Sequence, residues 1–348
     1  MVLLKNDVNV LPWDASSPIH IAVIGSEALE PNVHGGGSGQ VISYYVSSPL
    51  DAIREKLGIT SGVVNSTSTN CDPSGKRCVT YAYSAKDAVE IAPKADVAIV
   101  FGMTTSSEGG DRGDLNLNDG AGDLISAVAK VQHQTIAVAV TPGALLTPWS
   151  DDVPAAIVSF MPGQEYGHAV ADVLFGDVNP SGKLPLTFPS VENEMNFSDS
   201  QWPGVSDIST YSEDLLVGYR YYAAKNISPK FCFGHGLSYT KFKYDSLEIT
   251  SDAVMFDVQN VGDLDGATVP QMYFGFPDSA GEPPLQLKGF QKIYLHAGES
   301  SRVTFNVTDR TVSIWNTTSH DWSVAKGTHN VYVGESSCGI RLRGTFDA

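Results

Sequence analysis

Asp96-Val-Ala-Ile-Val-Phe-Gly102 is a run of seven residues whose single charge lies at its first position. Ile19-His-Ile-Ala-Val-Ile-Gly25 has the same character, and residues 135–140 and 155–160 are also almost entirely apolar. Short runs of this kind, rich in Val and Ile, are typical of strands that are buried on both faces of a sheet.

Amphipathic segments lie between these strands. They predict helices over residues 49–57, 85–92, 123–132 and 163–175, the last ending at Gly176. Alternating buried strands and helices predict the α/β class, with a mainly parallel sheet flanked by helices, over a first domain of residues 1–188.

The pattern changes after Pro189. Residues 189–240 are rich in Ser, Asn, Asp and aromatic residues without clear periodicity, and we interpret them as a connector. Residues 241–348 contain short alternating stretches, for example 253–258, 271–276, 302–307 and 329–334. About seven strands in such a length are typical of an all-β sandwich of the immunoglobulin or fibronectin type III kind.

Charge and hydropathy exclude two classes of partner. The 348 residues carry 22 Lys and Arg against 39 Asp and Glu, a net charge of -17. Binding to nucleic acid needs clustered cationic side chains, so we expect no nucleic-acid partner. No apolar run approaches the roughly 20 residues of a membrane-spanning helix, so we expect no membrane partner and a soluble chain.

The four cysteines suggest one disulfide and leave a second open. Cys71 and Cys78 flank a loop that contains Pro73 and Gly75, which let the chain double back, so we predict a disulfide between them. The alternatives are unrelated thiols or half of a metal site, but no second Cys/His pair with ligand spacing lies nearby. We therefore expect no metal. Cys232 and Cys338 could also pair.

Five Asn-x-Ser/Thr sequons predict N-glycosylation. Together with a disulfide they favour the secretory route of a eukaryote and an extracellular location, although chance occurrence is the alternative. The first residues lack the basic lead and apolar core of a signal peptide, so we expect the start of a secreted precursor to lie elsewhere. The sequons are at Asn65, Asn196, Asn226, Asn306 and Asn316.

Two polar loops follow the predicted strands. The cluster His34-Gly-Gly-Gly-Ser-Gly39 lacks the Gly-x-Gly-x-x-Gly spacing of a dinucleotide site, and we interpret it as a tight loop near a ligand mouth. The second loop places Glu108, Asp111 and Arg112 just past a buried strand, at the sheet edge where ligands bind in α/β folds. A carboxyl group shielded there can have a raised pKa and donate a proton, whereas the alternative is a solvated acidic loop.

Several motifs resemble the glycoside hydrolases of family three, especially the fungal β-glucosidases. The loop Ser107-Glu-Gly-Gly-Asp-Arg112 is similar to their acid/base loop. The longest matches are Pro162-Gly-Gln-Glu-Tyr-Gly-His168 and the segment 171–185, and Val217-Gly-Tyr-Arg-Tyr-Tyr222 and the segment 231–240 add to them. The segments 2–6 and 11–12 resemble the passage by which those enzymes leave their catalytic barrel.

The resemblance implies retaining hydrolysis of terminal β-D-glucosyl residues, as in the degradation of cellobiose and other oligosaccharides. In that family, an aspartate on the barrel attacks the sugar, and a glutamate on the second domain protonates the departing oxygen. Glu108 matches this glutamate. We expect the nucleophile to lie outside these residues, so that the chain alone turns over poorly and needs the barrel as partner in cis or in trans.

Other side chains in these motifs have weaker assignments. Asp111 and Arg112 could form an ion pair that shapes the loop, or they could contact the sugar. Gly110 stands where many family members place an aromatic residue that stacks on the leaving sugar, so no such contact can form here. Glu165 and His168 suit a helix start and its exposed side.

Three other functions compete with a β-glucosidase. One is a non-catalytic module that binds carbohydrate or protein, and another is a β-xylosidase of the same architecture. An N-acetylglucosaminidase fits less well, because such members generally take their proton donor from the barrel. No cofactor is expected in any of these cases.

Overall fold

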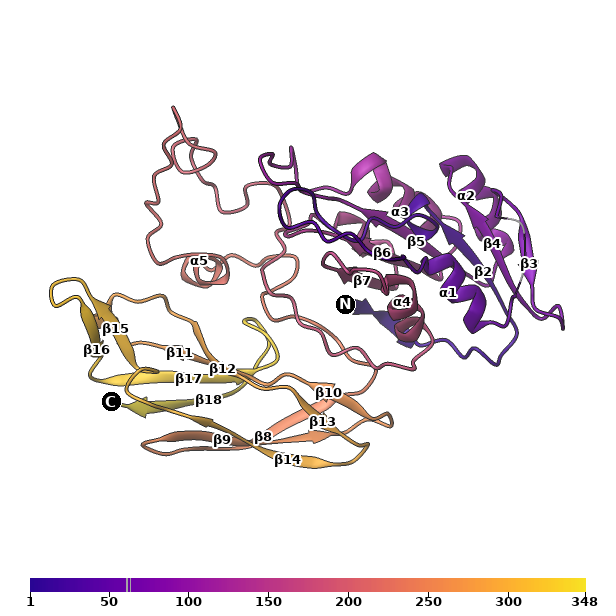
Figure 1. Cartoon of the computed structure of the whole chain (residues 1–348). Coiled ribbons are helices and arrows are strands. Elements are labelled where there is room, and N and C mark those ends of the chain that lie inside the picture. The colour runs from indigo at the N-terminus through magenta and orange to yellow at the C-terminus, as the bar shows by residue number, and fades with distance from the viewer. Residues whose placement is uncertain (61, 63) are drawn as a thin grey trace. The chain divides into compact units, whose positions relative to one another are not determined.

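A computed structural model describes residues 1–60, 62 and 64–348 of the chain (Figure 1). The chain divides into two compact units, Met1–Gly182 and Lys183–Ala348. The segment after Gly182, which includes the expected connector, belongs to the second unit.

The first unit is built on a seven-stranded sheet in the order β1-β7-β6-β5-β2-β4-β3. The four central pairings are parallel, whereas β1 and β3 pair antiparallel with their neighbours at the two edges. The mainly parallel α/β sheet is therefore confirmed. Its strands are β1 (Val2–Asn6), β2 (Ile19–Ile24), β3 (Thr69–Cys71), β4 (Arg77–Ala82), β5 (Val97–Met103), β6 (Thr135–Val140) and β7 (Ala155–Ser159).

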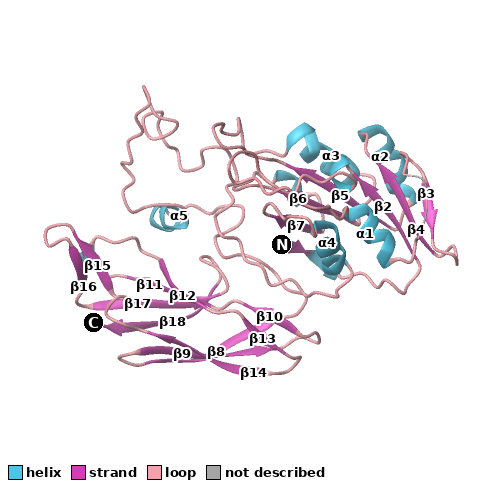
Figure 2. Cartoon of the chain, in the orientation of Figure 1, coloured by secondary structure: helices cyan, strands magenta, loops and turns pink. Residues whose placement is uncertain are grey.

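Helices cover both faces of this sheet, as Figures 1 and 2 show. Helix α1 (Pro49–Lys56) packs against α4 (Tyr166–Leu174), and α2 (Ala85–Ile91) packs near α3 (Ala121–Ala129). All six residues of β6 are buried, which explains why the central strands read as unbroken apolar runs. The helix start expected at residue 163 is too early, because Glu165 is the N-terminal cap of α4.

The second unit begins with irregular chain and then forms an antiparallel sandwich. One main sheet has the order β12-β11-β17-β18 and the other β14-β9-β8, which together give the seven expected strands. These strands are β8 (Phe242–Ile249), β9 (Ala253–Asn260), β11 (Gln271–Gly275), β12 (Gln286–Phe290), β14 (Ser300–Asn306), β17 (Thr328–Gly334) and β18 (Ile340–Asp347).

Four short strands and one α-helix also belong to this unit. Strands β10 (Gly266–Thr268) and β13 (Ile293–Leu295) form one two-stranded sheet, and β15 (Ser313–Asn316) and β16 (Asp321–Val324) form another. Side chains such as Val254, Phe256 and Phe274 fill the core of the sandwich. Helix α5 (Tyr219–Lys225) lies in the predicted connector, where the sequence showed no clear periodicity.

Two disulfides are present. Cys71–Cys78 joins β3 to β4, and Cys232–Cys338 joins the irregular part of the second unit to the sandwich. All five sequon asparagines are accessible to solvent at least in part, as glycosylation requires, and their glycosylation stays a prediction. Within the described ranges, no helix is both long and apolar enough to cross a bilayer.

Candidate active site

Glu108 lies in the loop that leaves the carboxyl end of β5, at the centre of the parallel sheet. The loop begins after Met103, and Thr104 is still tied to the sheet by a backbone hydrogen bond from its N–H to the carbonyl of Val140. Beyond this point the chain turns outward, and the Glu108 side chain is exposed. The position is the sheet edge where α/β proteins bind ligands.

The glycine cluster is the structural support of this loop. Gly36 forms an isolated parallel bridge with Ser107, donating its N–H to the carbonyl of Ser106 at 3.0 Å. The N–H of Glu108 in turn donates to the carbonyl of Gly36 at 3.3 Å. The loop after β2 therefore forms a short strand-like pairing with the loop after β5.

Glycine is required at position 37 for two reasons. Gly37 has a φ of 91°, a conformation that other residues rarely adopt. A Cβ atom at this position would lie 2.3 Å from the Cβ of Glu108 and 2.9 Å from its Oε2. The absence of a side chain lets the backbone approach the carboxylate, and the N–H of Ser38 donates to Glu108 Oε2 at 2.6 Å.

This contact sets the charge state of Glu108. Hydrogen bonds from the side chain and the backbone N–H of Ser38 stabilise the carboxylate and lower the pKa of Glu108 below its usual range. The expectation of a raised pKa was therefore wrong for this chain. That expectation assumed shelter from water, whereas the side chain is exposed, so desolvation raises the pKa by less than the hydrogen bonds lower it.

Arg112 connects the same loop to a third one. Its Nη1 donates to the carbonyl of Ala144, in the loop after β6, at 2.9 Å. Loops from three adjacent strands thus meet at one edge of the sheet. The expected ion pair between Asp111 and Arg112 stays a prediction.

An open cavity of about 410 Å³ lies beside the loop. Asn32 and His34 line it from the β2 side, and Ser107, Asp111 and Arg112 line it from the β5 side. The structure brings Asp111 and Arg112 to a cavity next to Glu108, and a contact with sugar is still a prediction. The sequence indicated the loop from His34 to Gly39 near a ligand mouth but did not indicate Asn32, because a single polar residue in a loop carries no recognisable pattern.

Glu165 and His168 lie at the start of α4, where their contacts are with each other and with neighbouring segments. His168 Nδ1 and Glu165 Oε2 are 2.7 Å apart, and the hydroxyl of Tyr45 donates to Glu165 Oε1. These contacts match the predicted place at a helix start and on its exposed side. The described residues bring together no group of three His, Cys, Asp or Glu side chains that could hold a metal ion.

Residues 1–239 match the glycosyl hydrolase family 3 C-terminal domain, and residues 268–337 match a fibronectin type III-like domain. The chain therefore belongs to glycoside hydrolase family 3. It is 37% identical to the probable β-glucosidase L of Aspergillus terreus, covering 99% of this chain and 52% of that protein. It is also 37% identical to the thermostable β-glucosidase B of Acetivibrio thermocellus, over 99% of this chain and 46% of that protein.

Solved structures agree with these matches. A β-glucosidase from Chaetomella raphigera superposes with a TM-score of 0.88 at 32% identity, over 99% of this chain and 53% of that one. A β-D-glucoside glucohydrolase from Trichoderma reesei gives a TM-score of 0.86 at 33% identity, over 99% and 53%. The chain spans about half the length of the relatives it matches.

Proposed function

We propose that this chain supplies the acid/base half of a retaining β-glucosidase, with Glu108 as the proton donor. The observation that carries the proposal is the geometry of Glu108. Its carboxylate is exposed at the carboxyl edge of the sheet, on a loop whose backbone is paired with a second loop. The names of the relatives support a β-glucoside as the substrate.

The partner in this proposal is the barrel domain of the family, carrying the nucleophilic aspartate in cis or in trans. Retaining glycosidases hold their two carboxyl groups about 5 to 5.5 Å apart. A second carboxylate at that distance and the loss of surrounding water both raise the pKa of an acid. Docking of the barrel would thus reverse the lowered pKa that Ser38 gives Glu108 in this chain.

We further propose that the chain belongs to a secreted, N-glycosylated enzyme of fungal type, which acts on cellobiose and other gluco-oligosaccharides from cellulose. The two disulfides and the five accessible sequon asparagines support the secretory route, because disulfides persist in oxidising compartments. Relatives from Aspergillus, such as the probable β-glucosidase L of Aspergillus terreus, support the fungal origin.

Co-expression with the barrel domain of a family-three β-glucosidase tests the proposal. We expect turnover of an aryl β-glucoside by the pair and none by this chain alone, with loss of turnover in Glu108→Gln. Glu165→Gln is the matched control, because Glu165 is an exposed glutamate of the same unit at the start of α4. Full activity of the Glu108→Gln pair would disprove the assignment.

A non-catalytic binding module is the second candidate function. An exposed aromatic pair in the second unit favours it, and that pair is independent of Glu108.

A further inference from the structure

The hairpin of β15 and β16 carries two exposed tryptophans. It forms a two-stranded sheet of its own beside the main sheets of the second unit (Figure 1). Trp315 and Trp322 lie directly opposite each other in the register of the two strands. Their exposed fractions are 47% and 45%, whereas Ile314, on the other face of β15, packs against the core of the sandwich.

The two indole rings are held in a defined arrangement. Their centroids are 5.5 Å apart and their planes meet at 65°. The guanidinium carbon of Arg310 lies 3.0 Å from the centre of the Trp322 ring, a cation–π contact. Arg310 is itself exposed, so its N–H groups stay available to a ligand at the edge of the rings.

Hairpin stability alone does not require this choice of residues. Cross-strand aromatic pairs do stabilise a hairpin, but β-branched residues are also favoured at such positions and would expose less apolar surface. Trp and Arg are the residue types enriched where binding energy concentrates, because they combine large rigid surface with hydrogen-bonding groups. The pair is therefore suited to contact a ligand.

The surroundings of the pair define the chemistry of that ligand. Ser319 and Asp321 add exposed hydrogen-bonding groups at the end of the hairpin. Arg310 is the single Lys or Arg of the segment 309–324, against the acidic Asp309 and Asp321, and the whole chain carries a net charge of -17. This charge disfavours phosphate, sulfate or uronate polymers. A neutral ligand with flat C–H faces and many hydroxyl groups is the best match.

We propose that Trp315, Trp322 and Arg310 form a binding site for an uncharged glucan chain, with pyranose rings against the indoles and hydroxyl groups hydrogen-bonded to Arg310. The site lies in a different unit from Glu108, so it does not depend on the proposed catalytic role. It would keep the chain on a polymer without contributing to bond cleavage.

The test measures binding of cellohexaose by titration calorimetry and retention on microcrystalline cellulose, with the full chain produced without glycans in an oxidising bacterial host. We expect measurable binding by the wild-type chain, and at least tenfold weaker binding by Trp315→Ala and by Trp322→Ala. Phe290→Ala is the matched control, because Phe290 is an aromatic residue of the same unit that is 67% exposed. Its affinity should equal that of the wild type.

Each outcome decides the proposal. A wild-type chain that does not bind either glucan overturns it, as do alanine variants that bind like the wild type. Binding to polygalacturonate that matches binding to cellohexaose would contradict the argument from charge. If the alanine variants lose their fold in circular dichroism, Trp315→Phe decides instead: weaker binding by the folded variant supports the site, and unchanged binding overturns it.

Discussion

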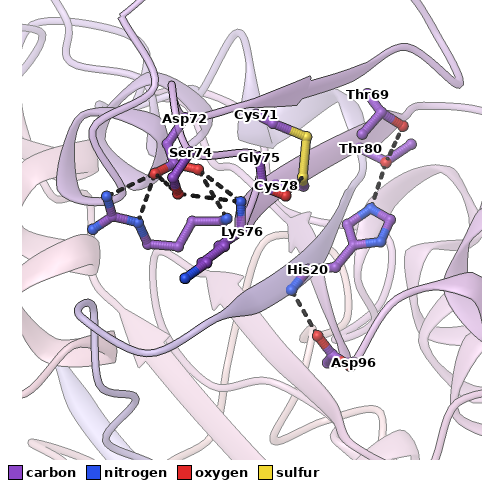
Figure 3. The surroundings of a disulfide bond; sticks show 11 residues. His20, Thr69, Cys71, Asp72, Ser74, Gly75, Lys76, Cys78, Thr80 and Asp96 are labelled. Carbon is purple, nitrogen blue, oxygen red and sulfur yellow. Dashed lines mark hydrogen bonds and ion pairs between the residues drawn. A yellow bond between two sulfur atoms is a disulfide. The ribbon is translucent and has the colours of Figure 1, made fainter.

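Two carboxylate side chains of the first unit have contrasting surroundings, one buried in a turn and the other exposed on a loop. Asp72, in the turn between β3 and β4, has a side chain that is 1% exposed and accepts hydrogen bonds from Ser74, Lys76 and Arg77 (Figure 3). Glu108, after β5, is exposed and accepts from Ser38. The Cys71–Cys78 disulfide closes the turn around Asp72, whereas backbone pairing between two loops supports Glu108.

Both carboxylates have a lowered pKa, so the pKa alone does not distinguish them. The two carboxylates differ in how many of their hydrogen-bond acceptor positions remain available to a ligand. The lone pairs of Asp72 are directed at Ser74, Arg77 and Lys76, and the group stabilises a turn. Glu108 keeps acceptor positions open to solvent, and a substrate or a second carboxylate can still approach it. Access and unused hydrogen-bonding capacity are therefore the better signs of a reactive group.

The largest expected effect is the loss of enzymatic turnover when Glu108 is replaced. In the pair formed with a family barrel, Glu108→Gln should lower turnover roughly 10²- to 10⁴-fold, the range for loss of general acid–base catalysis. Its midpoint of urea unfolding should fall only slightly near neutral pH, because the side chain is exposed and Gln can still accept the hydrogen bond from Ser38. Steady-state kinetics and unfolding by circular dichroism check the two halves of this prediction, and an unfolded variant would refute it.

Removal of the disulfide beside Asp72 should lower the stability of the chain and leave turnover unchanged. Replacing Cys71 and Cys78 together by Ser opens a loop with a sequence separation of 7. The expected loss is about 2–3 kcal/mol in the free energy of unfolding, from the entropy regained by the unfolded chain. Urea unfolding measures this loss, and turnover in the reconstituted pair should not change. A drop in turnover at full folding would show that the two regions are coupled.

Gly37→Ala tests whether the position of Glu108 matters as well as its presence. The new Cβ would overlap Glu108, so the carboxylate must move, and misplacement of a catalytic group by about 1 Å can cost up to 10²-fold in rate. We therefore expect turnover to fall by roughly 10- to 100-fold. Gly39→Ala is the control, since no atom lies within 4 Å of the position that a Cβ would occupy there. Equal effects of both changes would contradict the prediction.

The smallest expected effect is the pH dependence of the stability that Asp72 contributes. The Ser74 and Arg77 side chains hold the pKa of Asp72 below its usual value, so its contribution to stability is complete above about pH 4 and is lost as the pH falls through the folded pKa. The difference in urea midpoint between wild type and Asp72→Asn should therefore be larger at pH 6 than at pH 3. An equal difference at the two pH values would contradict this assignment.

The sequence predicted the central strands well because their apolar runs have one physical explanation. Residues expected as strands at 135–140 form β6 with the same bounds, and those at 19–25, 96–102 and 155–160 match β2, β5 and β7 within a residue at each end. The edge strands β1 and β3 were missed, and so was β4, which lies between β2 and β3. β1 contributes only five residues and β3 only three, and β4 lies beside the predicted disulfide loop, so no run stood out.

The site was predictable in part. The motif around Glu108 and its place after a buried strand could be recognised along the chain. Its pKa direction and the pairing of Gly36 with Ser107 could not, because both depend on a contact between residues about 70 positions apart in the sequence. The fibronectin-like sandwich followed from alternation, whereas α5 was too short, at seven residues, to show a helical period.

The Cys232–Cys338 disulfide has a mechanical consequence. It spans a sequence separation of 106 and encloses strands β8 to β17. A force applied at the ends of the second unit would pass through the sulfur atoms and bypass those strands. The enclosed chain corresponds to roughly 350 Å of extended length at about 3.4 Å per residue, which becomes available to stretching only after reduction. Strands β8 to β17 are thus shielded from tension along the chain as long as their surroundings are oxidising, whereas β18, which follows Cys338, is not.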